Sequence, residues 1–248
     1  MNAPGFNERY SRQIRLPRIG EKGQRKLVDS RIFIVGMGGL GSPVALYLAA
    51  AGVGHMTIAD FDLVDESNLQ RQIIHTQNDI GGLKAESAAH SLRQINPAIQ
   101  VETLDYSLDQ DDFTEQCATA DLLIDCTDNF PTRFALNEVA LKSGIPWVSG
   151  AAIRWEGQVT AFDPRHESSP CYQCLYPNPS MDSATCEMEG VVAPLVGIIG
   201  TMQAMEAVNI LIGEGQLHGI VWLFDAQSME WQKMVLPKNP RCPACGHA

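Results

Sequence analysis

The chain has 248 residues, of which 45% are hydrophobic and 19% charged, and its formal net charge is −11. This composition is typical of a soluble globular protein with a sizeable core. The acidic balance argues against a protein that coats nucleic acid, because such a protein needs a basic face to neutralise phosphates.

The N-terminus and the longest apolar stretch bear on where the protein resides. Residues 1–16 mix charges with single apolar residues and lack the apolar core of a signal peptide. The stretch 190–205 has no charged residue, but it contains Pro194 and is shorter than the roughly 18 to 20 residues of a membrane span. We therefore expect a cytoplasmic protein that does not bind membranes, in which this stretch forms a buried helix.

In the first half of the chain, short strands alternate with helices. Runs rich in β-branched and aromatic residues predict strands at 31–35, 55–60, 100–104, 121–126 and 146–149. Helices are predicted at 40–51, 84–95 and 132–143. Strands that alternate with helices at this spacing indicate a mostly parallel sheet with right-handed crossovers.

In the second half, the predicted strands are no longer separated by regular helices. They cover residues 157–162, 219–224 and 231–236, and one long helical region covers 191–211, entered through Pro194 and ended by Gly213. These strands predict an antiparallel extension of the same sheet.

Residues 36–41 read Gly-Met-Gly-Gly-Leu-Gly, which matches the G-x-G-x-x-G pattern between a predicted strand and a predicted helix. Asp60 ends the next strand, 19 residues beyond Gly41. Glycines let the backbone approach phosphates, the helix N-terminus offers unpaired N–H groups, and an aspartate at this place can bind a ribose. Taken alone, this context favours NAD, and an NAD-binding oxidoreductase is the alternative function that stays open.

The residues after Asp60 suit a triphosphate better than a nicotinamide cofactor. Asp62 follows two residues later, residues 67–72 carry amides and a guanidinium, and Lys84 opens the next predicted helix. Displacement at the α-phosphate of ATP needs cations around the triphosphate and a carboxylate for Mg²⁺. Residues 125–129, Asp-Cys-Thr-Asp-Asn, supply that carboxylate at the end of another strand, and the strand ends of one parallel sheet converge on one crevice.

Together, these motifs resemble the ThiF/MoeB/HesA family, prokaryotic relatives of ubiquitin-activating enzymes that adenylate the C-terminus of small sulfur-carrier proteins. The resemblance covers nearly the whole chain, and its marks are residues 9–14, 36–41, 60–62, 67–72, Lys84, 125–129, 150–152 and two Cys-x-x-Cys pairs. It implies a single α/β domain over 1–248, with a Rossmann-like, mostly parallel sheet continued by antiparallel strands. The nucleotide-binding part would cover about 30–150, and the carrier-binding and zinc part about 151–248.

The resemblance also implies ATP as a substrate and Mg²⁺ as a cofactor. The nucleotide-binding residues that it implies are Gly36, Gly38, Gly39, Gly41, Asp60, Asp62, Ser67, Asn68, Leu69, Gln70, Arg71, Lys84, Asp128 and Asn129. In this set Gly39 contacts the phosphates, Asp60 the ribose, and Asn68, Arg71 and Lys84 the triphosphate, while Asn129 lies beside the nucleotide. Asp128 would hold Mg²⁺. The implied catalytic residues are Arg12, Arg71, Lys84, Asp128 and Cys186.

Arg12 differs from the others, because the residues around it predict only a surface charge on an amphipathic helix. The resemblance implies instead that Arg12 reaches into the active site of the neighbouring subunit of a homodimer. The expected partner is a small ubiquitin-like sulfur carrier with a C-terminal Gly-Gly, whose carboxylate attacks the α-phosphorus and releases pyrophosphate. Since no rhodanese domain follows Cys245, we expect a separate sulfurtransferase to supply the sulfur.

Seven cysteines in a reducing compartment are poorly explained by a disulfide framework. Two Cys-x-x-Cys pairs give the four sulfurs of a closed, structural zinc site: Cys171, Cys174, Cys242 and Cys245. The alternative, a redox-active pair, would need only one of the two motifs. Cys117 and Cys126 are expected to pack in the core.

Cys186 lies in the polar segment 181–190, which is predicted to form a mobile loop over the active site. The resemblance implies that it can take up the activated carrier as a thioester or an acyl-disulfide. Nearby Glu187 and Glu189 disfavour a thiolate, so an incidental loop cysteine is the alternative. Residues 150–157 look like the molybdopterin-synthase branch and 222–225 like the thiamine branch, which leaves the pathway open.

Overall fold

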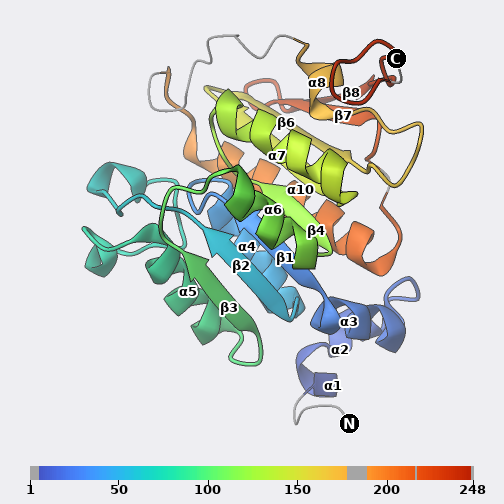
Figure 1. Ribbon diagram of the computed structural model, residues 1–248. Coiled ribbons are helices and arrows are strands. Elements are labelled where there is room, and N and C mark those ends of the chain that lie inside the picture. Colours follow the sequence, from blue (N-terminus) through green and yellow to red (C-terminus); the bar gives the residue numbers. More distant parts are fainter. Residues whose placement is uncertain (1–5, 178–188, 216, 247–248) are drawn as a thin grey trace.

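One mixed sheet of eight strands organises the computed structural model, which describes residues 6–177, 189–215 and 217–246 (Figure 1). The strand order is β3-β2-β1-β4-β5-β6-β7-β8. The parallel strands are β1 (Arg31–Val35), β2 (His55–Ala59), β3 (Gln100–Leu104), β4 (Leu122–Asp125) and β5 (Trp147–Ile153). The antiparallel continuation is β6 (Glu156–Phe162), β7 (Ile220–Asp225) and β8 (Glu230–Val235). The predicted α/β fold, with a mostly parallel sheet continued by antiparallel strands, is therefore confirmed.

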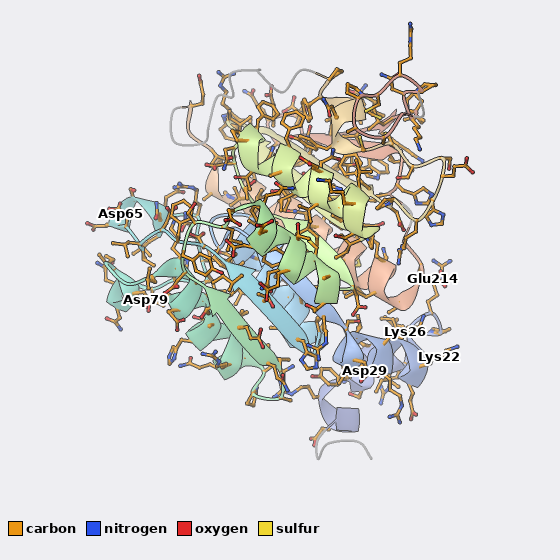
Figure 2. The ribbon with its side chains drawn as sticks, in the orientation of Figure 1. Lys22, Lys26, Asp29, Asp65, Asp79 and Glu214 are labelled. Carbon is orange, nitrogen blue, oxygen red and sulfur yellow. The ribbon has the colours of Figure 1, made fainter. Side chains whose placement is uncertain are left out.

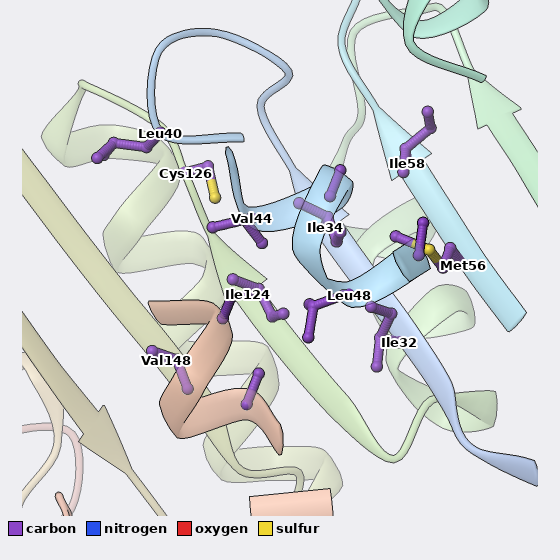
Figure 3. Packing of buried hydrophobic residues seen from close by; sticks show 14 of the residues in the cluster. Ile32, Ile34, Leu40, Val44, Leu48, Met56, Ile58, Ile124, Cys126 and Val148 are labelled. Carbon is purple, nitrogen blue, oxygen red and sulfur yellow. The ribbon is translucent and has the colours of Figure 1, made fainter. Parts of the chain in front are cut away.

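Helices cover both faces of the sheet, because its central strands are apolar on both sides. Along β1, Ile32 and Ile34 pack with α4 (Gly41–Ala51), α5 (Lys84–Ile95) and α10 (Ala193–Ile212), as Figure 3 shows in part. Phe33 and Val35 point the other way, into a second cluster with α6 (Gln110–Thr119) and α7 (Phe130–Ser143). A continuous apolar run is typical of a strand that is buried on both faces.

Helix α10 is long and apolar enough to cross a membrane by length and composition alone. The uncharged stretch 190–205 is only part of this helix, which covers Ala193–Ile212 and lies close to the predicted helical region 191–211. In this structure α10 packs on α4, β5 and β6, and half of its most apolar window is buried. We therefore interpret it as a core helix, as predicted.

The segment that precedes β1 folds as α1 (Phe6–Arg9), α2 (Ser11–Ile14) and α3 (Gly20–Asp29). The amide of Asn96 donates to the buried Tyr10 hydroxyl at 2.8 Å, and the side chain of Gln13 donates to the Ala51 carbonyl at 2.9 Å. These contacts anchor the segment at the C-terminal ends of α4 and α5, which is the edge of the sheet where the parallel strands begin (Figure 1).

Two differences from the predicted elements matter for the site. Strand β5 continues past residue 149 to Ile153 and turns directly into β6, with Arg154 at a positive φ of 51°. Helix α6 lies between β3 and β4, where Cys117 was expected on a helix but no bounds were predicted. The short helices η1 (Glu66–Asn68) and η2 (Gln77–Asp79) follow β2, and α8 (Tyr172–Leu175) follows β6.

Candidate active site

A cleft of about 1210 Å³ opens where the parallel strands end. Its walls come from the residues that follow β1, β2 and β4, and it continues over β5, β6, β7 and β8. Of the residues predicted to bind nucleotide, the cleft is lined by Gly36, Gly38, Gly39, Asp60, Asp62, Asn68, Arg71, Lys84, Asp128 and Asn129. Gly41, Ser67, Leu69 and Gln70 are not among its lining residues. The strand ends thus converge on one crevice, as predicted.

Residues 36–41, here called the glycine loop, turn tightly from β1 into α4. Gly36 has a positive φ of 95°, and a Cβ atom there would lie 2.8 Å from the Cys126 carbonyl oxygen. A Cβ atom at Gly41 would lie 2.0 Å from the Gly36 carbonyl oxygen. These two glycines are therefore required by the turn itself, whereas Gly38 and Gly39 face the cleft.

Asp60 holds the glycine loop from the end of β2. One carboxylate oxygen accepts the Met37 N–H at 2.7 Å, and the other accepts the Asp62 N–H at 3.0 Å. Burial raises the pKa of Asp60, while the charge of Lys84 and the two backbone hydrogen bonds act in the opposite direction. Asp60 therefore organises the loop and still presents oxygen lone pairs to the cleft.

Two cationic side chains enter the cleft from the segment after β2. Lys84 is only 6% exposed, and its Nζ lies 2.8 Å from an Asp62 oxygen. Arg71 donates to the Ser67 carbonyl at 3.1 Å. The Asp65 carboxylate accepts the Ser67 N–H at 2.8 Å and the Asn68 side chain accepts from the Asp65 N–H at 3.3 Å. This capping box fixes η1 in the segment between β2 and α5, where Figure 2 labels Asp65 and Asp79.

A buried ion pair supports the loop after β4. Asp125 is fully buried and pairs with Arg133 of α7, with 3.3 Å between Oδ2 and Nε. Asp125 also accepts hydrogen bonds from the Thr127 N–H at 2.9 Å and the Ser149 hydroxyl at 2.7 Å. Arg133 donates to the carbonyls of Thr127 and Gly150. This network ties the strand end to β5 and fixes the loop that carries Asp128.

Asp128 is exposed in the cleft, while Asn129 also has a local role. The Asn129 side-chain oxygen accepts the Thr132 N–H at 2.9 Å and so caps α7. None of the described residues accepts a hydrogen bond from its amide nitrogen. The geometry thus brings a glycine loop, two cations and an exposed carboxylate to one edge of a parallel sheet.

A model described as the ThiF family matches residues 10–244. The chain belongs to the ThiF family. The molybdopterin-synthase adenylyltransferase of Salmonella typhimurium is 45% identical over 239 residues, which are 96% of this chain and 96% of the relative. The sulfur carrier protein ThiS adenylyltransferase of Escherichia coli is 42% identical over 238 residues, 96% of this chain and 94% of the relative.

A solved structure of E. coli MccB with ATP has the same fold. Its TM-score is 0.82 at 20% identity, over 98% of this chain and 76% of that chain. The family model and the two relatives above confirm the resemblance to the ThiF/MoeB/HesA family.

Beyond the nucleotide-binding motifs, this ThiF-family cleft extends over the antiparallel half of the sheet. Phe224 and Trp231 stack with ring centroids 4.4 Å apart and line the cleft together with Tyr176. The cleft therefore extends well beyond the glycine loop, and aromatic side chains line its second half.

The four paired cysteines form one cluster. The Sγ atoms of Cys171 and Cys242 are 3.6 Å apart, those of Cys174 and Cys245 are 3.5 Å apart, and all four lie within 4.8 Å of one another. Four thiolates bound tetrahedrally at 2.3 Å would be separated by about 3.8 Å, whereas a disulfide requires about 2.05 Å. The cluster can therefore hold a metal ion, and it joins residues 171–174 to the C-terminal segment.

The remaining cysteines divide as predicted where they are described. Cys117 and Cys126 are both buried, and burial raises the pKa of the Cys117 thiol to about 12. Burial also raises the pKa of Cys126, beside the cleft. Cys186 lies outside the described residues.

Three residues that shape the cleft were not among the predicted site residues. Arg133 is paired with Asp125, Gln72 is buried beside Gly38, and the buried His75 contacts the glycine loop. The sequence contained a weak signal for Arg133. This residue lies four positions after Asn129, which is about one helical turn, so a helix that starts at Asn129 brings its side chain back beside the end of the preceding strand. His75 gave no such signal, because its contacts lie 38 and 12 residues away in sequence.

Proposed function

We propose that this protein uses ATP to adenylate the C-terminal carboxylate of a small sulfur-carrier protein. The observation that carries the proposal is one continuous cleft with phosphate-binding features at one end and aromatic surface at the other, in a chain of the ThiF family. The relatives named above are adenylyltransferases, one of them for the carrier ThiS. An NAD-dependent oxidoreductase is not supported by these relatives.

The reaction needs positioning and charge neutralisation more than acid–base catalysis. The carrier carboxylate is already ionised near neutral pH, so it attacks the α-phosphorus directly and pyrophosphate leaves with the bond electrons. Two anions must approach each other, and fixed cations lower that barrier. Lys84 and Arg71 supply these charges, and Asp62 holds Lys84 in place.

The other roles follow from the positions of the residues. Gly38 and Gly39 present backbone N–H groups to the phosphates, Asp60 binds the ribose, and Asn68 and Asn129 contact the nucleotide. Asp128 would hold Mg²⁺, which would supply positive charge to the triphosphate. The carrier tail lies over the aromatic half of the cleft, with its terminal glycine beside the α-phosphate.

We further propose that the cysteine cluster binds zinc. Four thiolates leave no open coordination position for water, so the site has a structural function. It holds the C-terminal segment against α8, and thereby supports the strands that line the aromatic half of the cleft. A redox role fits less well, because all four sulfurs converge on one point.

The function is tested with purified protein, ATP and a panel of candidate carriers from the same organism. We expect pyrophosphate release only with a carrier that ends in Gly-Gly, and a carrier mass increased by one AMP. The control is the same carrier with its C-terminal carboxylate amidated, which removes the nucleophile. Equal pyrophosphate release with the amidated carrier would contradict carrier adenylation, and the carrier with the highest rate identifies the pathway.

The proposed homodimer has a test of its own. Arg12 is exposed on α2, and α2 lies near the edge of the sheet where the parallel strands begin, opposite the cleft (Figure 1). Arg12→Ala and Asp128→Ala are expected to be inactive separately. After subunit exchange, half of the dimers are mixed and each has one intact site, so about a quarter of wild-type pyrophosphate exchange should return.

The matched control is Arg15→Ala, which removes another exposed arginine at the end of the same helix and should leave activity unchanged. No recovery in a mixture whose exchange has been verified by mass would show that each subunit has a self-contained site.

A further inference from the structure

His75 lies against the glycine loop but is not among the lining residues of the cleft. It is 5% exposed, and its Nε2 is 3.0 Å from the Met37 carbonyl oxygen. Its Nδ1 is 2.8 Å from the Ser87 hydroxyl, which α5 supplies. Both ring nitrogens are therefore engaged, one of them by the backbone of the loop itself.

The hydrogen bond to the Met37 carbonyl determines the orientation of the peptide group between Met37 and Gly38. No cis peptide bond occurs among the described residues, and in a planar trans peptide the C=O and the N–H point in opposite directions. Since the Met37 carbonyl faces His75, the N–H of Gly38 faces away from it, and Gly38 lines the cleft. None of the described residues accepts a hydrogen bond from this N–H, so it is available to a phosphate.

A rotated peptide would reverse this arrangement. Glycine at position 38 imposes little restriction on its own backbone, and the rotated form would place the Met37 carbonyl oxygen where the phosphates bind. Asp60 does not prevent this rotation, because it holds the N–H of Met37, which belongs to the preceding peptide group. Within the described residues, His75 is the only side chain that hydrogen-bonds to the Met37 carbonyl.

We propose that His75 is a positioning residue for nucleotide binding, which keeps the Gly38 N–H directed at the phosphates. This inference rests on the proposed nucleotide site. The Met37 carbonyl selects the tautomer of the ring, and Ser87 holds the ring in the orientation that reaches this carbonyl. A carbonyl only accepts hydrogen bonds, so Nε2 carries the proton, and Nδ1 of the neutral ring then accepts from the Ser87 hydroxyl. Burial lowers the pKa of His75, which favours this neutral form.

The experiment compares the binding of ATP with that of adenosine, which lacks the phosphates. His75→Leu replaces the ring by an apolar side chain of similar size and so removes the Nε2–H donor. We therefore expect ATP binding to weaken by about tenfold or more while adenosine binding is unchanged. His75→Gln places an amide donor near the Nε2 position and should restore ATP binding. His90→Leu removes an exposed histidine from α5 and is the matched control.

ATP binding by His75→Leu within about threefold of wild type would overturn the proposal, as would an equal loss for adenosine. If His75→Leu does not fold, Ser87→Ala decides: selective weakening of ATP supports the proposal, and no selective loss overturns it. Lys84→Ala separates this inference from the site assignment. Normal ATP binding by Lys84→Ala would reject the nucleotide site, whereas a loss there with normal binding by His75→Leu rejects only the role of His75.

Discussion

Replacing Asp128 with alanine is expected to lower the rate of ATP–pyrophosphate exchange by roughly a thousandfold or more, because charge neutralisation at the triphosphate dominates this chemistry. The carboxylate is exposed in the cleft, and it makes no hydrogen bond or ion pair with another described residue. Its removal should therefore leave the midpoint of thermal unfolding within about 2 °C of wild type.

The matched control is Asp29→Ala, since Asp29 is an exposed aspartate at the end of α3, remote from the cleft (Figure 2). It should exchange pyrophosphate at the wild-type rate. Asp128→Asn keeps the shape but not the charge, so it should resemble Asp128→Ala. Wild-type exchange by Asp128→Ala would contradict the role of this residue as the Mg²⁺ ligand.

Loss of zinc should have the largest effect on stability. Because a structural site forms only in the folded chain, its binding free energy contributes to folding. Cys174→Ser removes one of the four ligands, and we expect the free energy of unfolding to fall by at least about 4 kcal/mol, which for a chain of this size lowers the unfolding midpoint by about 10 °C. Zinc per chain, measured by mass spectrometry of the metal, should fall in parallel.

Cys117→Ala provides the control, because Cys117 is buried on α6, away from the cysteine cluster. The Cys117→Ala variant should retain one zinc per chain. A chelator added to the wild type should reproduce the effect of Cys174→Ser, and added zinc should reverse it. Freshly purified wild-type protein with well under one zinc per chain would contradict the proposed site.

The helices and strands of the parallel half of the sheet were predictable because their signals are local. The apolar run at Arg31–Val35 and the periodic helix at Lys84–Ile95 have the predicted bounds. The extension of β5 to Ile153 was missed because its residues 150–152, Gly-Ala-Ala, carry little strand propensity. Pairing with β6 makes them a strand, and that pairing depends on the turn at Arg154.

The candidate site was predictable where a motif is contiguous in sequence. The glycine loop, Asp60, Lys84 and residues 125–129 each follow a strand, and strands of one parallel sheet must end at the same edge. What the motif could not show is how each residue is used. Asp62 holds Lys84, and Asp125 is buried in an ion pair, although its neighbour Asp128 is exposed.

By itself, the sequence determined the strand and helix pattern, the glycine loop and the two cysteine pairs, because hydrophobic periodicity and short motifs are local properties of the chain. Only the tertiary structure decided that the four sulfurs meet and that Arg133 neutralises a fully buried carboxylate. It also decided that the ring of His75 contacts the Met37 carbonyl of the glycine loop. These contacts join residues far apart in sequence, and they form only when the helices pack on the sheet and exclude water from the groups between them.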